Sequence, residues 1–250
     1  MSSVRPPSLR EWLAEEPFSL ALSAGFFGFF AHAGFVSALE DAGLVPERVT
    51  GASAGALIGG LWSSGASAAS IERELRGLRR EHFWDPAPGF GLLRGGLFRE
   101  RVSGMLAARD FERAPVAAAL SAFDVRARRT VVLDRGDLAR AICASCAFPV
   151  LLQPVDVDGR PMLDGGIADR PGHAGLGARR RVLFHHLASK SPWRRTEPPI
   201  PRRSAMLTVT VRGLPRLGPF RLARGGEAFD RARAAARTAL ERPVSEVIAL

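Results

Sequence analysis

The sequence is poor in the residues that mark secreted, disulfide-stabilised chains. Two cysteines among 250 residues cannot form a disulfide framework, and a reducing compartment fits this composition. Residues 1–16 are polar, and Glu11, Glu15 and Glu16 stand where the apolar part of a secretory signal would begin. We therefore expect a cytoplasmic protein.

Lysine is almost absent, because Lys190 is the only one, so arginine supplies nearly all of the positive charge. Residues 1–169 hold 18 basic and 20 acidic residues, whereas residues 170–250 hold 17 basic and 5 acidic residues. This excess fits two interpretations: peripheral contact with an anionic membrane surface, or a solvated surface in an arginine-biased chain. The basic residues show neither zinc-finger spacing nor an RNP-like motif, so no nucleic-acid partner is expected. The basic groups in question are Arg179–Arg181 and Arg194–Arg195, near Trp193.

From Phe18 to Leu39 the chain has no Asp, Glu, Lys or Arg. These 22 residues are long enough to cross a bilayer, for which about 20 suffice. However, Gly25, Gly28 and Gly34 interrupt the run, so a strand, a glycine turn and a helix explain it better than one membrane span.

Apolar runs of strand length alternate with segments of helical spacing along the chain. The predicted strands cover residues 18–22, 49–50, 122–125, 130–133, 182–187 and 206–211, and the predicted helices cover 31–42, 53–62, 67–80, 137–146 and 227–240. Alternation of this kind predicts an α/β fold, here a three-layer α/β/α sandwich with a mostly parallel central sheet. Residues 1–17 are predicted as a polar extension and residues 18–250 as a single domain, in which residues 171–250 form a basic C-terminal part of unassigned role. The last helix fits either docking on the core or lying on a membrane.

Residues 50–55 read TGASAG and contain the pattern G-x-S-x-G, with Ser53 at its centre. A serine nucleophile between a strand and a helix sits on a sharp, strained turn, where large neighbouring side chains would clash. Its neighbours Gly51, Ala52, Ala54 and Gly55 are all small. The N–H groups at the start of the following helix would point to the place where negative charge develops. The pattern therefore predicts a nucleophile, although it also arises by chance in a chain rich in alanine and glycine.

A serine nucleophile needs a base, and the segment LDGGIADRPG offers Asp164 before Gly165 and Gly166. One interpretation of Asp-Gly-Gly is a β-turn. The other is a buried carboxylate that accepts the Ser53 proton, with a pKa raised above its usual value of roughly 3.9 by loss of solvation.

Histidines provide a competing arrangement, because His173, His185 and His186 all follow Asp164 in the order of an α/β-hydrolase triad. Two observations weaken it. Ser53 follows only about two predicted strands, and His185 and His186 lie within a strand-like run, where alternation points them to opposite faces.

Cys143 and Cys146 form a C-x-x-C pair at helical spacing. One pair is too few for a four-ligand zinc site, so we expect two small packed side chains, with a redox pair as the alternative. No metal site is predicted.

Three elements in this order resemble the patatin-like phospholipase family: a glycine loop, G-x-S-x-G about 25 residues later, and D-G-G further on. SAGFFG at residues 23–28 stands where the family has G-x-G-x-x-G, and TGASAGALIGGLWSSG is close to its nucleophile turn and helix. The segment from DVRARRTVVLD to PMLDGG is similar to its stretch that ends at the catalytic aspartate. The resemblance covers about residues 18–170.

The resemblance implies a Ser–Asp dyad, in which Ser53 is the nucleophile and Asp164 its base. Backbone N–H groups around Ala24, Gly25 and Phe26, together with that of Ala54, would form the oxyanion hole. The implied reaction is the hydrolysis of lipid carboxylic esters through an acyl-enzyme, without a metal or other cofactor, at a membrane surface.

Ser23 and Phe27 depart from the family pattern, the first replacing a glycine of the loop and the second standing where many members have arginine. Two alternatives therefore stay open. The chain could be a small-ester hydrolase or thioesterase that uses the same dyad, or a catalytically silent lipid-binding scaffold.

Overall fold

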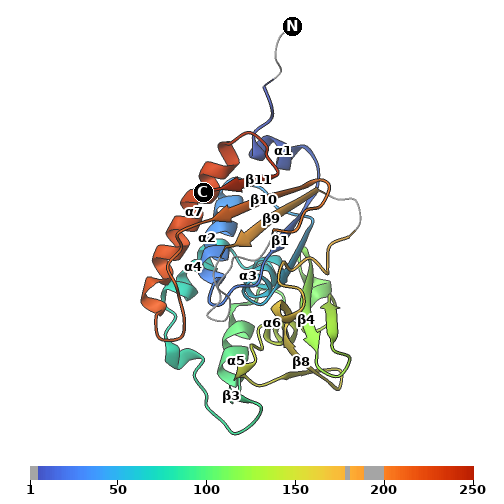
Figure 1. Cartoon of the computed structure of the whole chain (residues 1–250). Helices are drawn as coiled ribbons and strands as arrows, with labels where there is room; N and C mark the ends of the chain where they lie inside the picture. Colours follow the sequence, from blue (N-terminus) through green and yellow to red (C-terminus); the bar gives the residue numbers. More distant parts are fainter. Residues whose placement is uncertain (1–4, 178–180, 189–199) are drawn as a thin grey trace.

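The computed structural model describes residues 5–177, 181–188 and 200–250 (Figure 1). Its main feature is a nine-stranded sheet in the order β11-β10-β9-β1-β2-β4-β8-β7, with β5 on the other edge of β4. The strands of this sheet are β1 (Phe18–Leu22), β2 (Arg48–Ala52), β4 (Ala117–Asp124), β5 (Arg129–Leu133), β7 (Val155–Val157), β8 (Arg160–Asp164), β9 (Arg181–Leu187), β10 (Met206–Val211) and β11 (Val247–Ala249). A separate parallel pair joins β3 (Gly91–Leu93) to β6 (Val150–Leu152).

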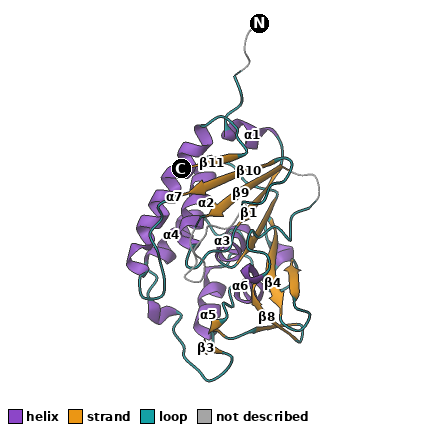
Figure 2. Ribbon diagram, in the orientation of Figure 1, coloured by secondary structure: helices purple, strands orange, loops and turns teal. Residues whose placement is uncertain are grey.

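The strands from β11 to β4 run parallel, and helices flank the sheet (Figure 2). The helices are α1 (Leu9–Glu15), α2 (Phe29–Asp41), α3 (Ala54–Ser63), α4 (Ala68–Arg76), α5 (Gly96–Met105), α6 (Leu138–Ser145) and α7 (Gly225–Glu241). The predicted α/β class with a large, mostly parallel central sheet is confirmed.

Successive side chains of the central strands pack on opposite faces of the sheet. In β1, Leu20 and Leu22 join the main core under the helices, whereas Ala21 between them joins a smaller cluster. That cluster is completed by Leu176 and Ile200, from the segments that follow β8 and precede β10. Both faces of β1 are therefore buried, which explains why the run carries no charge.

Strand β4 brings the ends of β2 and β8 together. Strand β2 runs parallel to the first part of β4, with Ala52 opposite Ser121, and β8 runs antiparallel to the last part, with Asp164 opposite Ala122. Since β5 occupies the other edge of β4, β2 and β8 share one edge and approach each other end to end. The residue after Ala52 therefore meets the last residue of β8.

Residues 18–39 do not form one helix, because β1 ends at Leu22 and α2 begins at Phe29. The strand, turn and helix predicted for this stretch are confirmed, and the single-span interpretation is wrong. Among the described residues, no helix is both long and apolar enough to cross a bilayer.

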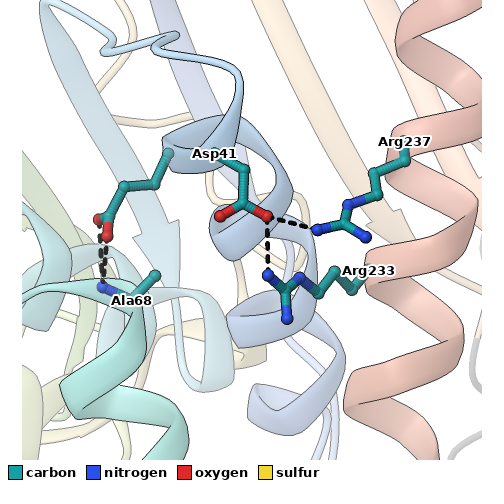
Figure 3. A network of polar contacts seen from close by, with 5 residues as sticks. Asp41, Ala68, Arg233 and Arg237 are labelled. Carbon is teal, nitrogen blue, oxygen red and sulfur yellow. Dashed lines mark hydrogen bonds and ion pairs between the residues drawn. The ribbon is translucent and has the colours of Figure 1, made fainter.

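Helix α7 docks on α2 through an apolar side and two ion pairs. Its buried residues include Phe229, Ala232, Ala236 and Leu240. In Figure 3, Asp41 at the end of α2 points to Arg233 and Arg237 of α7, and both distances are 2.8 Å. Ala68 at the start of α4 donates its backbone N–H to Glu40 of α2. Docking on the core, one of the two interpretations of the last helix, is the arrangement observed.

The N-terminal segment that was predicted as a polar extension contains helix α1. Its Leu9 and Leu13 are buried in the main core. Arg181 at the start of β9 holds α1 in place through ion pairs with Glu15 and Glu16, at 2.9 and 3.1 Å. Part of the C-terminal positive charge thus pairs with N-terminal acids.

The other basic residues considered for membrane contact, Arg179, Arg180, Arg194 and Arg195, lie outside the described residues, as does the neighbouring Trp193.

Candidate active site

Ser53 lies on the sharp turn between β2 and α3. Its φ of 53° and ψ of −119° are strained for a residue with a side chain. Neighbouring groups hold it there: the Ser53 N–H donates to Ser145 Oγ at 2.9 Å, and Ser145 Oγ donates to the Ser121 carbonyl at 2.6 Å. The Cys146 thiol donates to the Ser53 carbonyl at 3.2 Å. Ser145 at the end of α6 and Cys146 after it therefore hold the Ser53 turn in place through hydrogen bonds.

The two glycines of G-x-S-x-G allow α3 to begin very close to the sheet. A Cβ on Gly55 would lie 2.1 Å from the Leu22 carbonyl oxygen, and one on Gly51 would lie 2.6 Å from the Gly55 carbonyl carbon. Real side chains do not approach backbone so closely, so this turn requires glycine at both positions.

Asp164 ends β8 and is buried, with 4% of its surface exposed. Its Oδ1 accepts the Gly166 N–H at 2.8 Å, so the residue also caps the short turn that follows, as the β-turn interpretation expected. Burial raises the pKa of Asp164 to about 6, against the opposing effects of a Ser53 side-chain hydrogen bond and the Gly166 N–H. Oδ2 makes no hydrogen bond of standard geometry within the described part of the chain. The fold thus leaves a basic carboxylate oxygen beside Ser53.

Gly165 lets this turn lie against β4, since a Cβ there would lie 2.1 Å from the Ser121 carbonyl oxygen.

In the described part of the structure, the loop between β1 and α2 borders the serine with three free backbone amides, those of Gly25, Phe26 and Phe27. Within the described chain, the N–H groups of Gly25 and Phe26 have no hydrogen-bond partner, and neither has that of Ala54 at the start of α3. Ala24 differs from the prediction, because its N–H donates to the Arg170 carbonyl at 2.8 Å. Among the residues predicted for the oxyanion hole, Gly25, Phe26 and Ala54 therefore have a free backbone N–H group.

The peptide unit before these amides is held at both ends. Its Ala24 N–H bonds to Arg170, and its Ser23 carbonyl accepts from His32 Nε2 at 2.8 Å. A carbonyl only accepts, so His32 carries its proton on Nε2 and uses Nδ1 as the acceptor for His185 Nδ1, 2.9 Å away. Burial lowers the pKa of His32 to about 4, so the ring is neutral at pH 7. These contacts fix where the following amides point.

The histidines of the competing triad lie elsewhere. His185 bonds to His32 and stacks on Phe35, while the His173 ring packs edge-on against Phe184. None of the residues seen to line the cavity beside Ser53 is a histidine. Within the described chain, the structure brings Asp164, and no imidazole, to the serine.

An apolar cavity of about 120 Å³ opens beside Ser53. Phe26, Phe27 and Phe29 line one side, whereas Phe30 is buried in the core. Further lining residues come from α3 (Leu57, Leu61), α4 (Leu75), α5 (Phe98, Val102, Met105) and the β6 region (Phe148, Leu151, Leu152). Arg101 is the single charged residue among those seen to line it, and it is paired with Glu74. The cavity suits a hydrocarbon chain.

The two cysteines are free thiols that pack against the Ser53 turn and the core. Burial raises the pKa of Cys143 to about 12 and that of Cys146 well above its ordinary value, so both are protonated at neutral pH. Within the described residues, no group of three or more histidine, cysteine or carboxylate side chains is arranged to hold a metal.

Comparison with known proteins places this architecture. The model of the patatin-like phospholipase family matches residues 20–173. Two relatives, the uncharacterized NTE family proteins Mb1092c of Mycobacterium bovis and Rv1063c of Mycobacterium tuberculosis, are each 32% identical over 168 residues, or 66% of this chain and 47% of theirs. The chain therefore spans about half the length of these curated relatives.

Two solved structures share the fold. VipD from Legionella pneumophila matches with a TM-score of 0.61 and 14% identity, over 90% of this chain and 67% of its own. The type III effector ExoU of Pseudomonas aeruginosa matches with a TM-score of 0.51 and 16% identity, over 95% of this chain and 53% of its own. Because the family model covers more than half of the sequence, the chain belongs to the patatin-like phospholipase family.

Proposed function

We propose that the protein is a lipid acyl hydrolase that cleaves carboxylic esters of phospholipids or related lipids, with Ser53 as nucleophile and Asp164 as base. The observation that carries the proposal is the meeting of a strained serine and a buried carboxylate beside an apolar cavity. Membership of the patatin-like phospholipase family supports lipid hydrolysis as the general activity. In this proposal residues 18–250 act as one domain.

In the proposed acylation step, Ser53 Oγ attacks the ester carbonyl carbon while its proton passes to Asp164. The carbonyl oxygen becomes an oxyanion, which the N–H groups of Gly25, Phe26 and Ala54 stabilise. Each well-placed donor of this kind contributes about 2.7–4 kcal/mol to lowering the barrier. Collapse of the intermediate breaks the bond to the alcohol, which takes the proton from Asp164 and leaves an acyl group on Ser53.

In deacylation, a water molecule gives its proton to Asp164 as it attacks the acyl carbon, and the proton then returns to Ser53 Oγ. Asp164 must be ionised at the start of each step. With a pKa of about 6, it is mostly ionised at pH 7 yet far more basic than an exposed aspartate. Burial is thus the proposed source of its strength as a base.

The proposed acyl site is the apolar cavity, which ends at Ser53 and is walled by the phenylalanines of the glycine loop. A hydrocarbon chain that leaves water for this cavity gains about 0.8 kcal/mol for each buried methylene group. That gain would hold the ester at the serine.

Contact with a lipid surface is proposed at the β3–β6 pair, next to this cavity. Gly91 pairs with Val150, and the neighbouring Phe90 and Val150 are 92% and 82% exposed. Large apolar side chains so exposed are typical of surfaces that meet membranes or partners. We propose peripheral binding to the inner membrane face through this pair, which a sedimentation assay with vesicles would test by comparing wild type with Phe90→Ser.

A small-ester hydrolase or thioesterase is the second candidate, because a cavity of about 120 Å³ holds only a short length of chain unless its walls move. Lipid profiling by mass spectrometry separates the two. Lipid extracts incubated with the wild-type protein are expected to lose long-chain lipids and gain free fatty acids. The same extracts incubated with Ser53→Ala are expected to stay unchanged. Loss of short esters alone favours the second candidate, and no change favours a silent lipid-binding scaffold.

A further inference from the structure

A second hollow, of about 620 Å³, lies on the other side of the Phe26–Phe27 turn. Residues 211–221, which run from the end of β10 toward α7, form most of its wall. Phe26 and Phe27 border both hollows, and a Cβ added to Gly218 would lie 3.6 Å from Phe26 Cε1, so this loop lies next to the phenylalanine ring. Two aromatic side chains thus separate the second hollow from the Ser53 cavity.

The rim of the second hollow carries unsatisfied positive charge. Arg212, Arg216 and Arg221 are exposed, and none of these side chains makes an ion pair or hydrogen bond within the described chain. The arginines that follow in α7 differ, since they are paired with Glu227 and Asp41. Three unpaired guanidinium groups on one short loop can bind an anion through charge-assisted hydrogen bonds.

The floor of the same hollow is apolar. It includes Ala31, Leu187, Val211, Leu214 and Leu217. A ligand that uses both parts must therefore have an anionic group beside a hydrocarbon or glycerol-like portion. This combination favours an amphiphile over nucleic acid or an acidic peptide.

We propose that this hollow, named here the arginine groove, binds the phosphate-bearing end of an anionic phospholipid whose acyl chain lies in the Ser53 cavity. The inference rests on the proposed function. With the ester at Ser53, the glycerol and phosphate leave the cavity past Phe26 and Phe27, and the groove begins there. The arginine groove selects phosphate-bearing anionic lipids over neutral glycerides of equal acyl length.

The test compares two monomeric substrates with the same acyl chains, dihexanoylphosphatidic acid and dihexanoylglycerol, through the ratio of their kcat/KM values. The variant Arg212→Gln/Arg216→Gln/Arg221→Gln removes the positive charge of the rim. Its matched control, Arg126→Gln/Arg128→Gln/Arg129→Gln, removes the same charge from exposed residues of the β4–β5 turn and the start of β5, outside both hollows. Wild type is expected to prefer the phosphatidic acid.

The groove variant is expected to lower that ratio about tenfold, since each exposed charge pair contributes roughly a factor of two, and the control to leave it unchanged. Raising the salt concentration should lower the wild-type ratio in the same direction. An unchanged ratio in the groove variant, or an equal loss in the control, overturns the inference.

A binding measurement separates this inference from the proposed function. Calorimetry with dihexanoylphosphatidic acid and the Ser53→Ala protein needs no turnover. Binding that weakens about tenfold when the groove substitutions are added supports the groove, even if wild type hydrolyses neither substrate and the proposed function fails. Equal affinity with and without the three arginines contradicts it, even if wild type is an active hydrolase.

Discussion

Replacing Asp164 by asparagine should make the protein inactive and, at neutral pH, more stable. The carboxylate is buried, and its pKa lies at about 6 in the fold against 3.8 for the ordinary side chain. Because the unfolded chain releases this proton at lower pH than the folded chain, folding stability falls as pH rises from about 4 to about 6, and the loss is complete above that range. Asparagine is neutral at every pH and can still accept the Gly166 N–H. The substitution therefore removes the free-energy cost of burying an ionised carboxylate.

The size of the effect follows from the shift in pKa. A shift of about 2 units corresponds to about 3 kcal/mol of unfolding free energy at pH 8, and to about 1.5 kcal/mol at pH 5, where the carboxyl group is largely protonated in the fold. For a chain of this size, 3 kcal/mol raises Tm by about 6–12 °C.

Urea denaturation of wild type and Asp164→Asn at pH 5 and pH 8, followed by fluorescence, measures the difference. The expected result is a stabilisation that grows with pH, together with a loss of esterase activity of at least 100-fold. A variant that is less stable than wild type at pH 8, or stabilised equally at both pH values, would refute the assignment of Asp164 as a base whose burial destabilises the fold.

Three further predictions follow from the same geometry. The wild-type kcat/KM should rise about tenfold per pH unit below pH 6 and level off above it, as Asp164 ionises; a profile flat from pH 5 to 8 would contradict this. Gly55→Ala should destabilise the protein by at least 2 kcal/mol in thermal or chemical unfolding, because the new Cβ would overlap the Leu22 carbonyl. The control Gly104→Ala, at an exposed position of α5 with open space around it, should leave stability unchanged or raise it. Ser53→Gly should stabilise the fold by about 1 kcal/mol in the same assay, since glycine accepts a positive φ without strain; a loss of stability would show that the turn is not strained.

The sharp turn at Ser53 could be predicted from the sequence because its requirements are local. Gly51 and Gly55 are needed for contacts within a few residues or with the neighbouring strand, and such needs leave a short pattern. The brace from Ser145 left no pattern, since its hydroxyl reaches Ser53 from 92 residues further along the chain. The contact between the Arg170 carbonyl and the Ala24 N–H is also distant in sequence and could not be predicted. That contact occupies one of the amides predicted for the oxyanion hole.

Elements with strong periodicity were predicted well, and weakly patterned ones were missed. The predicted β10 has the observed limits, and α2 differs by one or two residues at its ends. Strand β4 begins at Ala117, five residues before its prediction, because alanine has little preference for strands and pairing with β2 decides its conformation. Helices α1 and α5 and strands β3, β6, β7 and β11 were not predicted, since they are short or carry glycine or lie beside proline.

Charge was the least informative feature of the sequence. The excess of arginine in the last third indicated either a membrane or a solvated surface, but several of these side chains form ion pairs that join elements of the fold. Arg181 pairs with α1, and Arg233 and Arg237 pair with Asp41. Which arginines remain unpaired depends on tertiary contacts, and composition does not reveal those.

The most direct test of the Ser53–Asp164 dyad is labelling with a fluorophosphonate probe, followed by peptide mapping of the modified residue. The account predicts covalent modification of wild type at Ser53, none in Ser53→Ala, and labelling slowed at least 100-fold in Asp164→Asn at pH 7. Modification at another serine, or equally fast labelling of Ser53 without the Asp164 carboxylate, would contradict it.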